Sequence, residues 1–447
     1  MVTPHSRPRR ACLFVALIAL LLPVACVYGQ AAQDPPAGAG GLAPGALNVR
    51  DFGAVGDGAA DDTAAFAAAL DQCGRQRGGI VFAPTGNYLI KGHLSVPDNV
   101  TLEGVFRSPT ARSQMAGTTL LAVEGRGADT GEPLILLHAN STLKGVAVFY
   151  PEQDAKGPVP YPWCVRGIGD NCAILDVLLV NPWRGVDFAT YPCGRHLIRG
   201  LYGQPLNTGL FIDNCLDCGR LEDIHFWPFW TEGLISYTQK SATGILICRA
   251  DWEMLSNCFL LGYGVGFHFT SAGHDGPNCL ITNSGADGCT TAVLVEVAQV
   301  HAGLLFSNCQ INAGIRVTPG ALGPVKFMNC GIFGTGYWQP YLQDGDARAY
   351  FAIQKGQGRM TFVGCHFYYP AGPFVPADLK PEDLPGIVND GNGLTLSACD
   401  FTDFPFTHIW LGLAARSTLV VGNRLKGGLK LTNTGQGQVE AGLNIGE

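Results

Sequence analysis

The sequence predicts an all-β protein whose strands stack as the coils of a parallel β-helix, with one helix capping its N-terminal end. Three observations predict this class. A four-residue motif (a large apolar residue, a spacer, a polar residue and usually Cys) recurs along the chain, as at Phe306–Cys309 and Phe327–Cys330. Apolar residues alternate at period two around it, which is typical of strands with one face inward. Gly is 60 of 447 residues and charged residues are only 15%, a composition that favours short strands and tight turns.

The spacing between successive copies of this motif gives the length of the repeat. Cys172, Cys193, Cys215 and Cys258 follow one another at 21, 22 and 43 residues, and 43 is about twice the unit. A period of about 20 to 50 residues is the mark of a solenoid, in which each repeat buries its apolar face by stacking on its neighbours. We expect a strand, a polar corner with Asn, and a second strand in each coil, from about Val100 to about Asn423.

Eight cysteines are interpreted as occupying one position of the repeat: Cys172, Cys193, Cys215, Cys258, Cys309, Cys330, Cys365 and Cys399. Free Cys behaves as a small buried hydrophobic residue. We therefore predict a ladder of stacked, mostly reduced thiols, with a few bridges between adjacent coils as the alternative. The Cys215-x-x-Cys218 pair has no second pair at metal-site spacing, so no metal site is predicted.

The N-terminus reads as a targeting segment. Arg7, Arg9 and Arg10 precede the apolar run 11–25, which is short for a membrane span. We expect a signal peptide over residues 1–29, an Ala/Gly/Pro-rich linker over 30–46, and one β-helix domain over 47–447. The protein is predicted to be secreted, periplasmic or on the cell surface without stable membrane insertion, with a lipid anchor at Cys26 as the alternative.

A helix is predicted in the cap region, residues 47–98. Asp61–Thr63 supplies a capping sequence, and Phe66, Ala69, Leu70 and Cys73 then fall on one helix face. A solenoid needs its open end covered, and this helix is assigned to that role.

The charge balance limits the partners. The formal charge is -7, and without the three N-terminal arginines it is about -10. We therefore expect no nucleic-acid partner, whereas a polyanionic sugar in a local basic groove is compatible with an acidic protein. The oligomeric state stays open.

The cap region also carries a family resemblance. The stretches Asn48–Gly58, Asp61–Thr63 and Gly78–Tyr88 closely resemble the opening of pectate-lyase-superfamily proteins, which include rhamnogalacturonases, polygalacturonases, epimerases and phage tailspikes. The resemblance implies a right-handed parallel β-helix and a polysaccharide substrate. It supplies no catalytic set, because the Asn-x-Asp, Asp-Asp, Gly-His-Gly and Arg-Ile-Lys motifs of polygalacturonases are not found in order.

Candidate catalytic residues are those that break the repeat. Glu253 stands four residues before Asn257, where other coils have Leu, Val or Met, and Asp251 shares its phase. Two carboxylates at i and i+2 on one strand face suit the acid and base, or acid and nucleophile, of glycoside cleavage if a bulge turns them outward to a groove. The alternative is a buried salt bridge to Arg249 or Arg220.

Neighbouring coils extend this set. Asp275, Asp287 and His301 are further catalytic candidates, and His could shuttle a proton or orient a carboxylate. An ordinary turn is the alternative for Asp287, and a strand histidine for His268. The candidate substrate-binding residues are Arg220, Trp227, Trp230, Glu232, Arg249, Trp252, His268 and His274.

These residues predict a glycoside hydrolase that cleaves a pectin-like or other acidic polysaccharide with paired carboxylates and no cofactor. The alternatives are a polysaccharide lyase with an Arg or Lys base, for which calcium is possible, and a non-catalytic glycan-binding protein.

Overall fold

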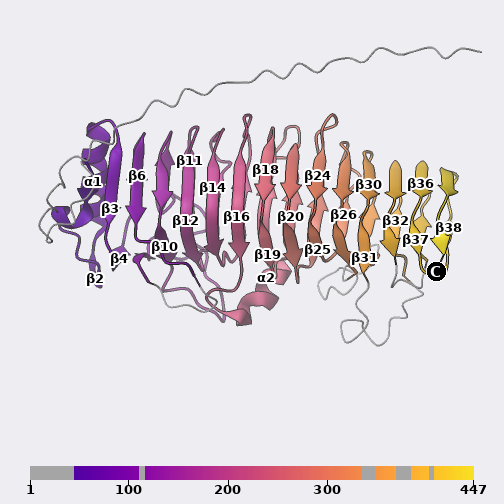
Figure 1. Ribbon diagram of the computed structural model, residues 1–447. Helices are drawn as coiled ribbons and strands as arrows, with labels where there is room; N and C mark the ends of the chain where they lie inside the picture. Colours follow the sequence, from indigo (N-terminus) through magenta and orange to yellow (C-terminus); the bar gives the residue numbers. More distant parts are fainter. Residues whose placement is uncertain (1–44, 110–115, 335–347, 369–383, 402–406, 447) are drawn as a thin grey trace, which may run out of the picture. The chain divides into compact units, whose positions relative to one another are not determined.

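The computed structural model describes residues 45–109, 116–334, 348–368, 384–401 and 407–446, and confirms the predicted parallel β-helix. Its strands form two parallel sheets, one of 27 strands (sheet A) and one of 13 strands (sheet B). Figure 1 shows the strands stacked side by side in chain order from the indigo to the yellow end. Residues Leu42–Glu447 form one compact unit. The expected signal peptide and all but the last two residues of the expected linker lie outside the described residues.

Sheet B contains β5 (Leu94–Val96), β8 (Ile135–His138), β11 (Trp163–Ile168), β13 (Arg184–Phe188), β15 (Thr208–Ile212), β17 (Thr243–Ile247), β20 (Val265–Phe269), β23 (Thr291–Val295), β26 (Ile315–Val317), β29 (Ala352–Gln354), β32 (Ile387–Asn389), β35 (Ile409–Leu411) and β38 (Leu431–Asn433).

Sheet A begins with β1 (Leu47–Asn48), β2 (Asp57–Asp61), β3 (Gly79–Ala83), β4 (Gly86–Ile90), β6 (Val100–Gly104), β7 (Thr118–Ala122), β9 (Thr142–Lys144), β10 (Val146–Phe149), β12 (Ala173–Val180), β14 (Leu197–Gly203) and β16 (Arg220–Phe226). It continues with β18 (Glu253–Ser256), β19 (Phe259–Leu261), β21 (Cys279–Thr282), β22 (Gly285–Asp287), β24 (Leu304–Ser307), β25 (Gln310–Asn312), β27 (Val325–Met328), β28 (Gly331–Phe333), β30 (Arg359–Val363), β31 (His366–Tyr368), β33 (Gly393–Ser397), β34 (Asp400–Phe401), β36 (Ser417–Val421), β37 (Arg424–Leu425), β39 (Gln438–Gly442) and β40 (Ile445–Gly446).

The N-terminal helix forms where the sequence predicts it. Helix α1 (Thr63–Arg75) follows the 3-10 helix η1 (Val49–Phe52), and its predicted face of Phe66, Ala69, Leu70 and Cys73 is the buried one. Figure 1 shows α1 at the indigo end of the stack. A second 3-10 helix, η2 (Glu232–Leu234), leads into helix α2 (Ile235–Ser241). No helix in the described ranges is long and apolar enough to cross a membrane.

A regular coil turns at one asparagine between two short strands of sheet A. Asn257, Asn283, Asn308 and Asn329 occupy this asparagine bend with φ between 49° and 56°. Asn tolerates this left-handed conformation better than most residues, which explains its recurrence. Inward residues stack in columns on either side of the bend. Phe306, Phe327 and Phe362 form one such column, with ring centroids 4.8 and 5.0 Å apart.

The strand register corrects the predicted cysteine ladder. Cys258, Cys309, Cys330, Cys365 and Cys399 each follow this bend and share one column, with Gly364 and Ala398 in place of asparagine in the last two coils. Cys172, Cys193 and Cys215 do not belong to it, so the prediction that all eight cysteines share one position is wrong. These three cysteines, two of them in Asn-Cys motifs, lie at another corner, between a sheet B strand and the following sheet A strand. Asn171 and Asn214 have φ of 61° and 55° there, because both corners need a left-handed residue.

The cysteines of the described residues are all free thiols, as predicted. Most are buried, and burial raises the pKa of the Cys258 thiol to about 12. Each thiol in the column from Cys258 to Cys399 lies against backbone carbonyls, as Cys365 does with Phe327 O at 3.4 Å. The ladder therefore packs as buried thiols, and burial favours the protonated form of Cys258.

Candidate functional site

A reversal of the backbone at Trp252 separates the two carboxylates that the sequence places on one face. Trp252 has a φ of 60° and is 57% exposed, and strand β18 begins directly after it, at Glu253. The turn breaks the alternation between i and i+2, so Asp251 faces the surface while Glu253 faces the interior. The prediction that both share one strand face is wrong, because the alternation of a strand does not extend through a left-handed residue.

Glu253 keeps the strict register of its column and is fully buried. Its Oε1 lies 2.9 Å from Nε2 of His196, which is also fully buried. Burial by itself lowers the pKa of His196, but the charge of Glu253 and a hydrogen bond with Cys215 outweigh it and raise that pKa well above its usual value. The prediction that Glu253 turns outward to a groove is therefore wrong, and the partner of this buried pair is His196, not Arg249 or Arg220.

Asp251 is held at the surface of the same corner by two side chains. Its Oδ2 accepts a hydrogen bond from Nη2 of Arg249 at 2.9 Å, and its Oδ1 accepts one from Nε2 of Gln299 at 2.6 Å. Gln299 is buried, whereas the side chains of Arg249 and Asp251 remain 22% and 29% exposed. The buried Gln299 thus orients the Asp251 carboxylate, which remains partly accessible to solvent.

Two further acids and a histidine complete the corner. Nη1 of Arg249 lies 4.0 Å from Oδ2 of Asp275, and Nε2 of His274 lies 3.4 Å from Oδ2 of Asp213. The largely buried Asp213 also accepts a hydrogen bond from the Arg249 backbone N–H at 2.9 Å. We call these five residues, Asp213, Arg249, Asp251, His274 and Asp275, the acidic corner.

Other candidates lie away from this corner. His301 is exposed in a turn, and its coil instead contributes Gln299 to Asp251. Asp287 ends strand β22 and Arg220 begins strand β16. His268 forms an ion pair with Glu296 across 2.9 Å on sheet B. Among the described residues, no hydrogen bond or ion pair joins these four side chains to the acidic corner.

The predicted aromatic ligands lie at the other end of the sheet B strands. Trp227 and Trp230 follow strand β16 and pack on an outer cluster with Phe229 and Tyr202, while the exposed Glu232 begins η2. A pocket of about 480 Å³ opens there, lined by Pro109, Tyr202, His225, Trp227, Phe229 and Phe259. Burial lowers the pKa of His225, so this pocket is apolar and uncharged at neutral pH. The structure shows it as a separate feature, not as part of a groove shared with Asp251.

His196 and Gln299 are contacts that sequence reasoning missed. His196 is 57 residues from Glu253, and Gln299 is 48 residues from Asp251. The stacking of inward positions on successive coils could have indicated the contact between His196 and Glu253. Strand pairing places Gly219 between them, and an inward glycine next to two inward polar residues is unusual in this core.

Comparison with known proteins supports the fold assignment. Residues 46–146 match the family model described as rhamnogalacturonase A/epimerase, pectate lyase-like. The chain is similar to mannuronan C5-epimerase AlgE3 of Azotobacter vinelandii, with 40% identity over 80 residues, which are 16% of this chain and 4% of that protein. It is also similar to alginate lyase 7 of the same organism, with 51% identity over 55 residues, which are 12% of this chain and 6% of that protein.

Among solved structures, the N-terminal fragment of bacteriophage Phi29 gene product 12 aligns with a TM-score of 0.54 and 14% identity, covering 89% of this chain and 66% of that one. The Agl-KA catalytic domain aligns with a TM-score of 0.51 and 13% identity, covering 88% and 69%. Residues 46–146 therefore resemble the pectate-lyase-like family, and the described residues share the parallel β-helix fold of the aligned structures.

Proposed function

We propose that this pectate-lyase-like protein is a carbohydrate-active enzyme that cleaves glycosidic bonds of a polysaccharide at the acidic corner. The observation that carries the proposal is the sharing of one guanidinium, that of Arg249, by two carboxylates with access to solvent, Asp251 and Asp275. Because both contact the same small group, their separation stays below about 9.5 Å, the upper end of the range for paired glycosidase carboxyl groups.

The environments of the two acids suggest different roles. Asp251 accepts hydrogen bonds from Arg249 and Gln299, so it is fixed in place as the carboxylate that takes a proton from water or attacks the sugar. The side chain of Asp275 is 87% exposed and can meet the glycosidic oxygen as the proton donor. His274, half exposed beside Asp213, supplies a route by which a proton returns.

A second candidate is proton abstraction next to the carboxylate of a uronic acid, as in a lyase or an epimerase. Segments of this chain are similar to mannuronan C5-epimerases and to an alginate lyase, which favours a uronate substrate. Arg249 would face the substrate carboxylate, and His274 would accept the proton from the carbon beside it. One of the acids would then donate a proton, to the leaving glycosidic oxygen in a lyase or back to that carbon in an epimerase. The two candidates share the site and the acidic substrate class and differ in the product.

The experiment incubates the purified chain with alginate-like, pectic and neutral polysaccharides and measures three products. Hydrolysis gives new reducing ends without ultraviolet absorbance, elimination gives both, and epimerisation incorporates deuterium from D2O without either. We expect Asp251→Asn and Asp275→Asn to lower product formation by about 10² or more, whereas Asp71→Asn on the exposed face of α1 leaves it unchanged. Binding without any product would instead favour a non-catalytic glycan-binding protein.

We also propose export, on the strength of the arginines and the apolar run before residue 26. Cell fractionation tests it: a mature chain lacking about the first 29 residues outside the cytoplasm is the expected result.

A further inference from the structure

A column of three inward positions inside the β-helix departs from the apolar rule. Strand pairing stacks His196, Gly219 and Glu253 on successive coils, since Arg220 N–H bonds His196 O at 3.1 Å and Met254 N–H bonds Gly219 O at 3.0 Å. Further along the same column stand Cys279, Leu304 and Val325. A histidine and a glutamate therefore reach toward one another across a glycine, deep in an otherwise apolar core.

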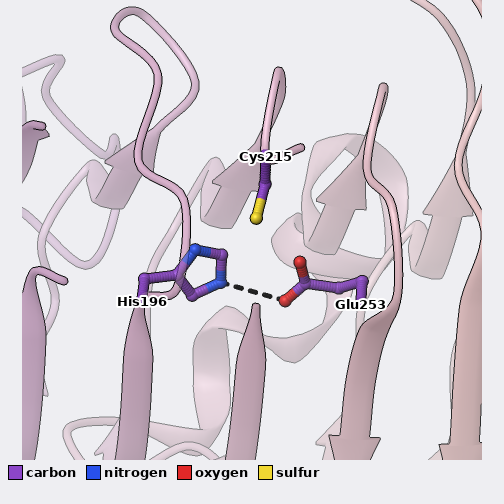
Figure 2. Close-up of side chains that lie close together, drawn as sticks. All are labelled: His196, Cys215 and Glu253. Atoms are coloured by element: carbon purple, nitrogen blue, oxygen red, sulfur yellow. Dashed lines mark hydrogen bonds and ion pairs between the residues drawn. The ribbon is translucent and has the colours of Figure 1, made fainter. Parts of the chain in front are cut away.

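A cysteine closes the third side of this space. Figure 2 shows the Cys215 sulfur between His196 and Glu253. One potential ligand atom from each residue lies within 4.8 Å of the others, and all three residues are fully buried. Nδ1 of His196 lies 2.8 Å from Cys193 O, a contact in which Nδ1–H donates and Nε2 is directed at Glu253 and the sulfur. A backbone carbonyl that fixes the ring in this way is typical of metal-bound histidines.

The pair of His196 and Glu253 leaves this space incompletely satisfied. Oε2 of Glu253 is buried without a hydrogen-bond partner among the described residues. A buried carboxylate oxygen without a partner is costly. Gly219 makes the room: a Cβ at this position would collide with the Glu253 carboxyl and the His196 ring. The missing side chain and the unpaired oxygen both point to a further group within the cluster.

We propose that His196, Cys215 and Glu253 form a buried structural zinc site. Imidazole nitrogen, thiolate sulfur and carboxylate oxygen are the three ligand types that Zn²⁺ accepts, and a fourth ligand completes its tetrahedron. One neutral imidazole, one thiolate and one carboxylate balance the two positive charges, so a dry core can hold the ion as a neutral unit. Zinc would take the place of the protons on Nε2 and on the thiol and would occupy the free oxygen of Glu253.

The position of the site connects it to the acidic corner. The Asp251 N–H donates to Cys215 O at 2.8 Å, and the Cys215 N–H donates to Arg249 O at 3.2 Å. An ion held by Cys215 and Glu253 would therefore fix the backbone on both sides of Asp251. The sequence-based expectation of no metal site considered ligands close together along the chain, whereas these three come from three different coils.

The test is metal content and cobalt spectroscopy on the full chain. After exposure to Zn²⁺ and removal of loosely held ions with a weak chelator, we expect elemental analysis to find one zinc per chain. Substitution with Co²⁺ should give a thiolate-to-cobalt charge-transfer band in the near ultraviolet, and Zn²⁺ should raise the unfolding temperature.

Variants locate the site. Cys215→Ser and Glu253→Gln should lower zinc content at least tenfold, and Cys215→Ser should abolish the cobalt band. Cys258→Ser, an equally buried thiol in the regular ladder, should retain both. Circular dichroism verifies that each variant is folded, and the cobalt band of the unmodified chain stands as evidence even where a variant fails to fold. A chain that retains no zinc, or zinc and cobalt signals unchanged in folded Cys215→Ser, would show that the cluster is only a buried ion pair.

Discussion

The two kinds of corner in each coil differ in what they hold. At the asparagine bend the left-handed residues include Asn257, Asn283, Asn308 and Asn329, and the column that follows the bend holds Cys258, Cys309 and Cys330. At the corner after the sheet B strands, the left-handed residue of one coil is Trp252, and around it lie Arg249, Asp251 and the buried Glu253. Polar side chains therefore gather at the corner after the sheet B strands, whereas the asparagine bend is followed by a column of buried thiols.

The largest expected effect tests the apolar stacking beside the asparagine bend. Phe327→Ala removes the middle ring of a stacked column between Phe306 and Phe362. Because the neighbouring coils cannot close the gap, we expect the free energy of unfolding to fall by about 3–5 kcal/mol. Denaturant titration measures it. A loss below about 1 kcal/mol would mean that the column is not tightly packed.

A glycine pair compares the two regions directly. Gly219→Ala places a methyl group against Glu253 and His196, and we expect destabilisation of about 1–3 kcal/mol by overpacking. Gly331→Ala, at an outward strand position between the exposed Gln310 and His366, is the control, since its Cβ would meet only ordinary contacts with Phe333 and Gln310 at 3.6 and 3.9 Å. Equal effects of the two substitutions would mean that crowding against Glu253 and His196 does not cause the loss.

Left-handed residues give a smaller contrast. Asn308→Ala replaces a residue that tolerates a φ of 54°, so stability should fall by about 1 kcal/mol. Trp252→Gly relieves a φ of 60° at an exposed side chain and should raise stability by up to about 1 kcal/mol. Thermal unfolding of both variants checks the signs, and a loss of stability in Trp252→Gly would show that the indole is needed for packing.

The smallest expected effect is on the loss of stability at acidic pH. Burial acts to raise the pKa of Glu296, but hydrogen bonds from His268 and Thr270 outweigh it and lower that pKa. A lowered folded-state pKa contributes stability above the unfolded value of 4.5, and this contribution is lost as the pH falls through the folded pKa. Since Glu296 is partly exposed, well under about 1 kcal/mol is expected. Glu296→Gln should therefore lose less stability on acidification than the unmodified chain, and identical acid profiles would contradict this.

Much of the fold follows from the sequence because its information is local. Period-two alternation and the spacing of the motifs predict the strands and their stacking, and the face of α1 follows from Phe66, Ala69, Leu70 and Cys73. The two corners were merged into one ladder because Asn-Cys occurs at both: Asn171 and Asn214 have the same left-handed geometry as Asn308. The Asn-Cys motif indicates a local backbone conformation, but it does not indicate at which corner of the coil that conformation lies.

The candidate site was predicted only in part. The break in the pattern at Arg249–Glu253 indicates the right coil: Arg249 contacts Asp251 and Asp275, and His274 contacts Asp213 beside them. The orientation of Glu253 could not be predicted, because it depends on the φ of Trp252 and on His196 from another coil. To predict contacts between coils one must know the strand register, which the pattern of a single sequence defines only approximately.

The most direct test of catalysis at the acidic corner is the rate of product formation by Asp251→Asn on the polysaccharide that the unmodified chain converts. Asp251 is the acid that the corner holds in place and leaves accessible, through Arg249 and Gln299. With an unchanged unfolding temperature, we expect the rate to fall by a factor of about 10² or more relative to Asp71→Asn. Product formation at the unmodified rate in folded Asp251→Asn would place the chemistry elsewhere on the β-helix.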